Sequence, residues 1–213
     1  QPGDHAMIRP AAIFALVATL LLHGAPTMAQ TNEPERPPTG HLAIFGDPEA
    51  DLLEHLSKVA RREGRIEEAV ALTWQLNARI EEVLGGHQTI QWNFYTSVVE
   101  MWLDTDAPEK AVGVLDRMMT DLGPKWWFDD FERGAVSLMR GFVHVRAAEF
   151  IRAETSYREG FAYVADLGSS GDLGLNCAHR RFADVLEKNG NPREALEHRQ
   201  IAGTTDQSCD WRL

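Results

Sequence analysis

The sequence predicts an all-α protein in which helical hairpins are stacked as an α-solenoid, and two observations support this fold class. First, four alanines follow one another at a constant spacing of 42 residues: Ala69, Ala111, Ala153 and Ala195. A fixed period of this kind is typical of stacked copies of one supersecondary unit. Second, from about residue 48 to residue 203 apolar residues recur at helical spacing, without the strict alternation that a strand would show.

The first 46 residues carry processing and tether signals. Residues 7–9 supply a start and one positive charge, residues 11–22 form an unbroken apolar run, and Ala29 precedes a polar stretch. This order is typical of a secretory signal, so we expect residues 1–29 to be removed, with residues 1–6 lying upstream of the initiator. The alternative is an uncleaved anchor, but the run is shorter than the roughly 20 residues that span a bilayer. Residues 30–46 are proline-rich and predict an extended linker.

A secretory signal places the mature protein outside the cytoplasm. We expect it in a bacterial periplasm or secreted, without stable insertion in a membrane. The formal net charge of −11 opposes nonspecific binding to nucleic acid and to anionic lipid. We therefore expect a protein or peptide partner and no nucleic acid, and the sequence does not identify that partner.

The chain contains two cysteines, Cys177 and Cys209. In an oxidising compartment two thiols are candidates for a disulfide. The bridge would close a ring of about 33 residues and contribute roughly 3 to 4 kcal/mol in chain-entropy terms. We expect it to hold the tail, residues 204–213, against the last repeat. The alternative is a buried Cys177 and a free thiol in the tail.

Within residues 47–203 each copy consists of two helices joined by a short turn. Asp47, Pro48 and Glu49 supply the cap, the first-turn proline and the acidic residue that often begin a helix, so the repeat domain begins at residue 47. Pro108 and Pro192 stand where a second helix begins. The four turns align as residues 64–69, 106–111, 148–153 and 190–195.

These turns, each ending on the periodic alanine, resemble the tetratricopeptide repeat (TPR), with 42 residues per copy instead of 34, over about residues 48–203. The resemblance implies a right-handed superhelix of about four repeats, in which the alanine lets the second helix pack closely on the first. The family's two further small positions are occupied in the last two copies by Gly141, Gly160, Ala183 and Ala202. The first two copies have Ser57, Leu76, Val99 and Met118 there, so we expect wider helix spacing.

The resemblance also implies that the first helix of each pair lines a concave groove. The groove positions change from charged in the first copy to apolar in the third and mixed in the fourth. The residues expected to bind a partner are Lys58, Arg61, Arg62, Asn93, Thr96, Glu100, Leu138, Phe142, Val145, Arg146, Arg180 and Asp184. Exposed apolar surface is unfavourable, so we expect a partner's peptide or helix to cover the middle, with arginines pairing with its acids. The alternative is coverage by the protein's own linker or tail.

The hypothesis that follows is an exported, non-catalytic interaction scaffold. One alternative is a structural accessory domain or subunit of an envelope enzyme or assembly complex, and another is an enzyme with its site in the groove. No nucleophile signature or metal-binding motif is present, so we expect no catalytic residue, metal or cofactor. His179 and His198 can approach one another across the last helix pair, where we expect a surface or packing role. The alternative is a metal site, for which no third ligand is visible.

The densest aromatic group is Trp126, Trp127, Phe128 and Phe131. Large aromatic side chains are buried on average, so we expect these residues to pack in the core and between repeats. The alternative is a platform on which a partner docks.

Overall fold

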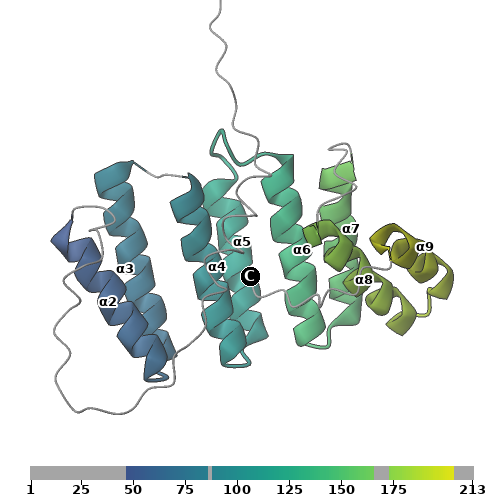
Figure 1. Ribbon diagram of the computed structural model, residues 1–213, viewed down its shortest axis with the longest axis horizontal. Coiled ribbons are helices and arrows are strands. Elements are labelled where there is room, and N and C mark those ends of the chain that lie inside the picture. Colours follow the sequence, from purple (N-terminus) through teal and green to yellow (C-terminus); the bar gives the residue numbers. More distant parts are fainter. Residues whose placement is uncertain (1–46, 86–87, 166–172, 204–213) are drawn as a thin grey trace, which may run out of the picture. The chain divides into compact units, whose positions relative to one another are not determined.

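The computed structural model describes residues 47–85, 88–165 and 173–203, and this part of the chain contains helices and no strand (Figure 1). The all-α prediction is confirmed. The helices are α2 (Pro48–Arg62), α3 (Ile66–Leu84), α4 (Gln88–Asp104), α5 (Pro108–Leu122), α6 (Asp130–Arg146), α7 (Phe150–Val164), α8 (Leu173–Lys188) and α9 (Pro192–Ala202).

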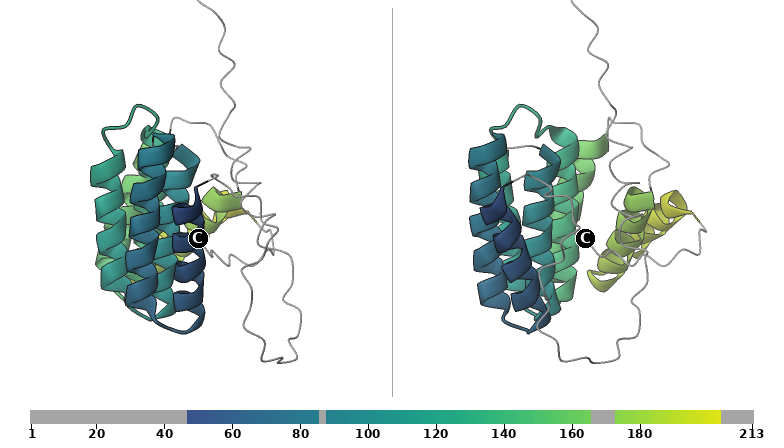
Figure 2. Two further views of the ribbon diagram at one scale, coloured as in Figure 1. Left: turned by 90° about the vertical axis from the view of Figure 1, so that its left-hand side faces the viewer. Right: turned by 60° about the vertical axis from the view of Figure 1, so that its left-hand side comes forward.

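Neighbouring helices pair into four hairpins, α2 with α3, α4 with α5, α6 with α7 and α8 with α9. Each hairpin also packs against the next one, through α3 and α4, α5 and α6, and α7 and α8. The views in Figures 1 and 2 show the first three pairs as successive hairpins along the molecule. The predicted α-solenoid of four TPR-like units is therefore confirmed.

The turn inside each hairpin has the same backbone geometry in all four copies. Gly64, Asp106, Ala148 and Gly190 take left-handed φ angles of 74°, 54°, 57° and 82°. The following amide donates a hydrogen bond of 2.8–2.9 Å to the carbonyl five residues earlier: Arg65 to Ala60, Ala107 to Trp102, Glu149 to His144 and Asn191 to Leu186. This bond satisfies a carbonyl at the end of the first helix, as in a Schellman motif. The period of 42 residues is thus a repeat of backbone conformation.

The periodic alanines lie in the hydrophobic core. Ala69, Ala111, Ala153 and Ala195 are fully buried. A further close contact distinguishes the third hairpin, where a β-carbon at Gly160 would lie 2.7 Å from the Leu138 side chain and 3.0 Å from the Gly134 carbonyl oxygen. Accordingly α6 and α7 pack most closely, and α4 and α5 least closely.

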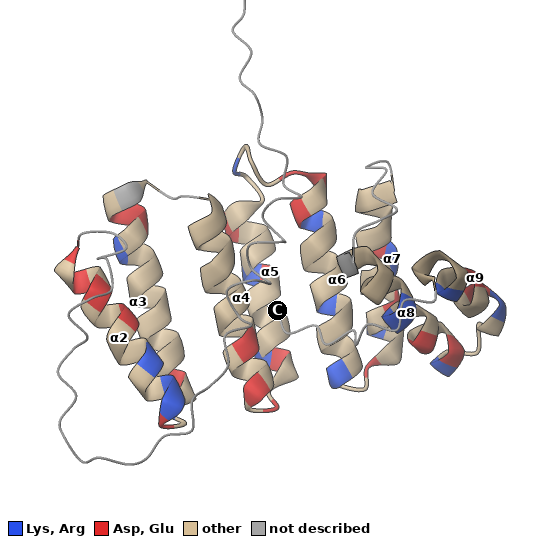
Figure 3. Ribbon diagram, in the orientation of Figure 1, with Lys and Arg blue, Asp and Glu red and all other residues tan. Residues whose placement is uncertain are grey.

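The first helix begins as its sequence predicts. The Asp47 carboxylate accepts hydrogen bonds from the Glu49 and Ala50 amides at 3.0 and 2.9 Å, which caps α2. It also accepts from the Arg79 guanidinium of α3 at 2.7 Å, and this bond, together with the cap, lowers the pKa of Asp47. Figure 3 shows acidic residues in the first turn of α2 and basic residues in its last turn, which suits the helix dipole.

Candidate functional site

The predicted binding residues of the first two copies are Lys58, Arg61 and Arg62 of α2 and Asn93, Thr96 and Glu100 of α4. Together with Asp104 of α4, which was not among the predicted residues, they make up the polar surface that we call the first-helix face. Arg61 joins the two helices, because its guanidinium lies 2.6 Å from the Asp104 carboxylate and 3.7 Å from that of Glu100. The structure therefore brings residues from two copies together, and part of the predicted basic charge is used to link the repeats.

The remaining side chains of this face are available to a partner to different degrees. The Lys58 ammonium pairs with Glu54 one turn earlier at 2.7 Å but stays 66% exposed. Arg62 and Asn93 are exposed. The Thr96 hydroxyl turns back to its own helix and donates to the Trp92 or Asn93 carbonyl oxygen, at 3.2 and 3.1 Å. Arg62 has no ion pair with any residue of the described ranges, so its charge faces solvent.

The third copy differs from the expected exposed apolar lining. Leu138 is 3% and Phe142 9% exposed, so neither presents a surface that needs a partner to cover it. Leu138 packs against α7 because Gly160 leaves room for it, and it belongs to the cluster that joins α6, α7 and α8. The Arg181 guanidinium of α8 lies 5.6 Å from the Phe142 ring centre. Val145 is half-buried, and Arg146 is exposed.

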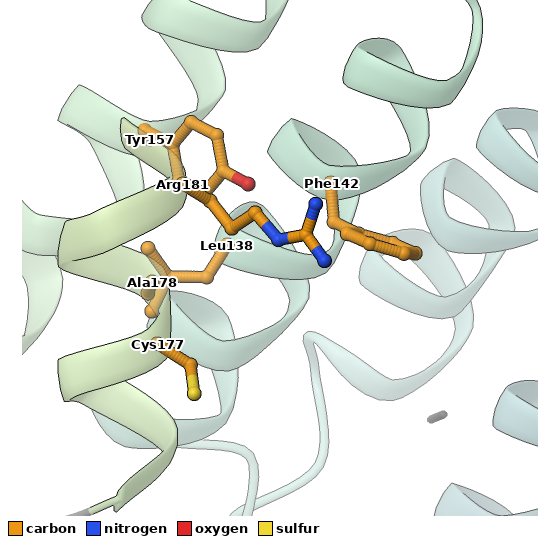
Figure 4. Close-up of a pocket in the computed structure, with 6 residues that line it drawn as sticks. All are labelled: Leu138, Phe142, Tyr157, Cys177, Ala178 and Arg181. Carbon is orange, nitrogen blue, oxygen red and sulfur yellow. The ribbon is translucent and has the colours of Figure 1, made fainter. Parts of the chain in front are cut away.

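A small cavity lies between α6 and α8 (Figure 4). Its volume is about 10 Å³, and it is lined by Leu138, Phe142, Tyr157, Cys177, Ala178 and Arg181. A space of this size holds about one water molecule. Figure 4 shows the Tyr157 hydroxyl and the Arg181 guanidinium on the same side of the cavity as Phe142.

The fourth copy uses its predicted residues mainly within the last hairpin. Arg199 of α9 lies 3.2 Å from the Asp184 carboxylate of α8 and also pairs with Glu187. Arg180 and Cys177 are half-buried on α8. Cys209 lies outside the described residues, so the disulfide stays a prediction. The same holds for the signal peptide, the linker and the tail.

The aromatic group at the start of the third copy is divided. Trp127 and Phe128 are buried in the core, with ring centres 5.9 Å apart, whereas Phe131 is half-buried. Trp126 is 93% exposed. The packing prediction therefore holds for Trp127 and Phe128 and is wrong for Trp126. Neighbouring residues in an irregular turn point in different directions, and no periodicity could have assigned them.

Two clusters of titratable side chains lie among the packed helices. His179 and His198 meet with their Nδ1 atoms 2.7 Å apart, and burial lowers the pKa of both. In the described ranges no three His, Cys, Asp or Glu side chains are arranged to hold a metal ion.

The second cluster surrounds the start of α6 and was not predicted from the sequence. The Glu132 carboxylate accepts from the Asp129 amide at 3.2 Å and from the Gln88 side chain of α4 at 3.1 Å. Burial, followed by the neighbouring Asp129, raises the pKa of Glu132 to about 7. The spacing Asp-x-x-Glu is a capping-box signal that could have located Asp129 and Glu132. It could not have located Gln88, which comes from α4.

None of the helices in the described ranges is long and apolar enough to cross a bilayer.

Comparisons with known proteins support the fold. No protein-family model matches the sequence, and no curated protein matches it. The chain is similar to a solved structure of nearly identical TPR-like repeats of a kinesin-light-chain-type protein from Podosopora anserina, with 17% identity, a TM-score of 0.54, and coverage of 73% of this chain and 74% of that one. It is also similar to BtubC (BKLC) from P. vanneervenii, with 14% identity, a TM-score of 0.55, and coverage of 72% of this chain and 61% of that one. At such identities the likeness establishes a TPR-like fold.

Proposed function

We propose that this TPR-like protein is an exported, non-catalytic interaction scaffold that binds a partner's peptide or helix on its first-helix face. The observation that supports the proposal most is the joining of α2 and α4 by Arg61, which makes one surface from two copies. Solenoid repeats offer such extended surfaces to partners.

The chemistry of this face favours a partner with acidic residues. Lys58 and Arg62 project into solvent from α2, and neither is held in a buried ion pair. Arginine pairs with carboxylates through two parallel hydrogen bonds, which adds direction to the contact. Since the apolar residues of the third copy are already buried, polar and charged contacts would carry recognition.

A cross-linking capture from a cell-envelope extract tests this proposal. We expect Lys58→Glu/Arg62→Glu to lose a partner that the wild-type chain recovers, because two attractive charges become repulsive. The matched control is Arg152→Glu/Arg193→Glu, which makes the same charge change on the second helices α7 and α9, at side chains 70% and 93% exposed. Equal recovery with the first variant and the wild type would remove the first-helix face from the proposal.

Export is a separate part of the proposal, and it is supported by the apolar run at residues 11–22 followed by Ala29. Protein recovered from a bacterial periplasm should begin at Gln30. An intact residue 7–29 segment in that fraction would contradict removal.

The burial of Leu138 and Phe142 favours a second candidate function. A repeat array whose apolar positions are covered by its own helices suits a structural accessory domain or subunit of an envelope complex. On this alternative, the chain would co-purify with a larger complex, and the charge reversals on α2 would leave that association unchanged.

A further inference from the structure

The last hairpin is joined by an imidazole pair. The Nδ1 atoms of His179 on α8 and His198 on α9 lie 2.7 Å apart, with the ring centres separated by 4.9 Å. Phe161 of α7 stacks on His179 at 4.1 Å between ring centres, and Phe182 meets His198 edge to face at 4.6 Å. Three helices therefore meet at two side chains of a type whose ordinary pKa is about 6.5.

The close nitrogen contact limits how many protons the pair can hold. When both rings are neutral, one Nδ1 carries a hydrogen and donates it to the other Nδ1. A first added proton can occupy the distant Nε2 of the donor ring, which leaves the hydrogen bond intact. A second proton must be placed on the accepting Nδ1, so that two N–H groups and two positive charges face each other. The doubly protonated pair cannot keep this geometry.

The charged groups around the pair have opposing effects on the protonation of His198. On α9, Glu194 and Glu197 attract a proton to His198, whereas Arg158 of α7 opposes it. Arg158 is itself held by Glu194 at 2.6 Å and by Glu154 at 2.8 Å. On α8, the groups that face His198 are the His179 imidazole and the Phe182 ring. No described carboxylate accepts a hydrogen bond from either ring.

The helix that the pair holds is short and is the last helix of the described part of the chain. α9 has 11 residues, and among the described helices it packs mainly against α8. Leu196 and Ile201 are each 56% exposed on it. Helices of this length are marginal without tertiary contacts, so α9 depends on its contacts with α8 and α7.

We propose that the His179–His198 pair is an acid-sensitive latch, which holds α9 against α8 near neutral pH and releases it when both imidazoles are protonated. Release would uncover the aromatic surface of Phe161 and Phe182 at the end of the solenoid. The array would then offer an apolar end surface only in an acidic environment.

Hydrogen exchange of the full chain at pH 7.5 and pH 5, corrected for the intrinsic rate at each pH, tests the latch. The pKa of His179 is lowered from 6.5 to about 4 when α9 is packed. Protonation therefore favours the released state at pH 5 more than at pH 7.5, and α9 protection should fall about 30-fold between these conditions. Amides of α3, a helix without histidine, serve as the internal reference and should change little. Parallel changes in α9 and α3 would overturn the proposal.

Variants separate the latch from general acid weakening. His179→Gln/His198→Gln removes both groups that bind the protons, so its α9 protection should no longer depend on pH. Glu194→Gln removes the ion pair with Arg158, which should lower α9 protection at both pH values and keep the pH dependence. If the double variant retains the wild-type pH dependence, the pair is not the sensor.

A titration that needs no variant provides an independent check. The imidazole proton resonances of wild-type His179 and His198 should shift in two separate steps, both below pH 6.5, because the protons bind to a coupled pair. Two superimposed steps near 6.5 would contradict the proposal even if a variant fails to fold.

Discussion

Substitution of glycine by alanine should have opposite effects at two helical positions, Gly160 in α7 and Gly113 in α5. At Gly113 an added β-carbon meets nothing within 4 Å, so the change should only reduce backbone entropy in the unfolded state and raise helix propensity. This gain is about 1 kcal/mol. At Gly160 the same carbon would lie 2.7 Å from Leu138 Cγ and 3.0 Å from the Gly134 carbonyl oxygen.

The leucine end can rotate away, but the carbonyl belongs to the backbone of α6, so the two helices must separate. Overpacking of this kind costs about 1–3 kcal/mol, which more than cancels the gain in propensity. We therefore expect Gly160→Ala to lose about 1 kcal/mol and the two variants to differ by about 2 kcal/mol.

Equilibrium urea unfolding followed by circular dichroism measures both variants against the wild type. An unchanged m-value would show that the shift in midpoint reports stability. Equal stabilisation by both substitutions would refute the close packing of α6 on α7.

Two further predictions concern the capping cluster of α6 and the cysteines. The pKa of Glu132 is raised from 4.5 to about 7 in the folded protein, so its protonated form stabilises the fold. This stability is fully present below pH 4.5 and is lost as the pH rises through 7. The loss is about 2–3 kcal/mol. In urea unfolding at pH 4.5 and pH 8, the wild type should show this loss relative to Glu132→Gln, which keeps the pH dependence of all other groups, and equal pH dependence in both proteins would disprove the assignment. For the cysteines, the intact mass of the oxidised protein should not increase when an alkylating reagent is added without a reductant. Addition of two alkyl groups would rule out the Cys177–Cys209 bridge.

The fold was predictable from the sequence because it depends on local and periodic features. The periodic alanines are buried in every copy, and Asp47 caps α2 as its neighbours indicate. The approach of His179 to His198 was also predictable, since a hairpin of two helices with a short turn fixes which residues lie level with each other.

The candidate site was less predictable, because exposure depends on neighbours that are distant in the sequence. Leu138 occupies a position that lines the groove in the repeat family, but the missing side chain of Gly160 draws it into the hairpin. Phe142 is covered by Arg181 of the next copy. The pKa of Glu132 depends on burial and on Asp129, and Gln88 comes from a helix about 44 residues earlier. No local pattern contains this information.

The most direct test of the fourfold repeat is the stability of Ala148→Gly, because Ala148 takes the left-handed conformation that glycine takes at positions 64 and 190. A left-handed conformation costs a residue with a side chain roughly 1–2 kcal/mol. The repeated turn therefore predicts that Ala148→Gly stabilises the protein by about 1 kcal/mol in urea unfolding, after the greater unfolded-state entropy of glycine is subtracted. A loss of about 1 kcal/mol, as expected for glycine in an ordinary helix, would contradict the shared turn geometry.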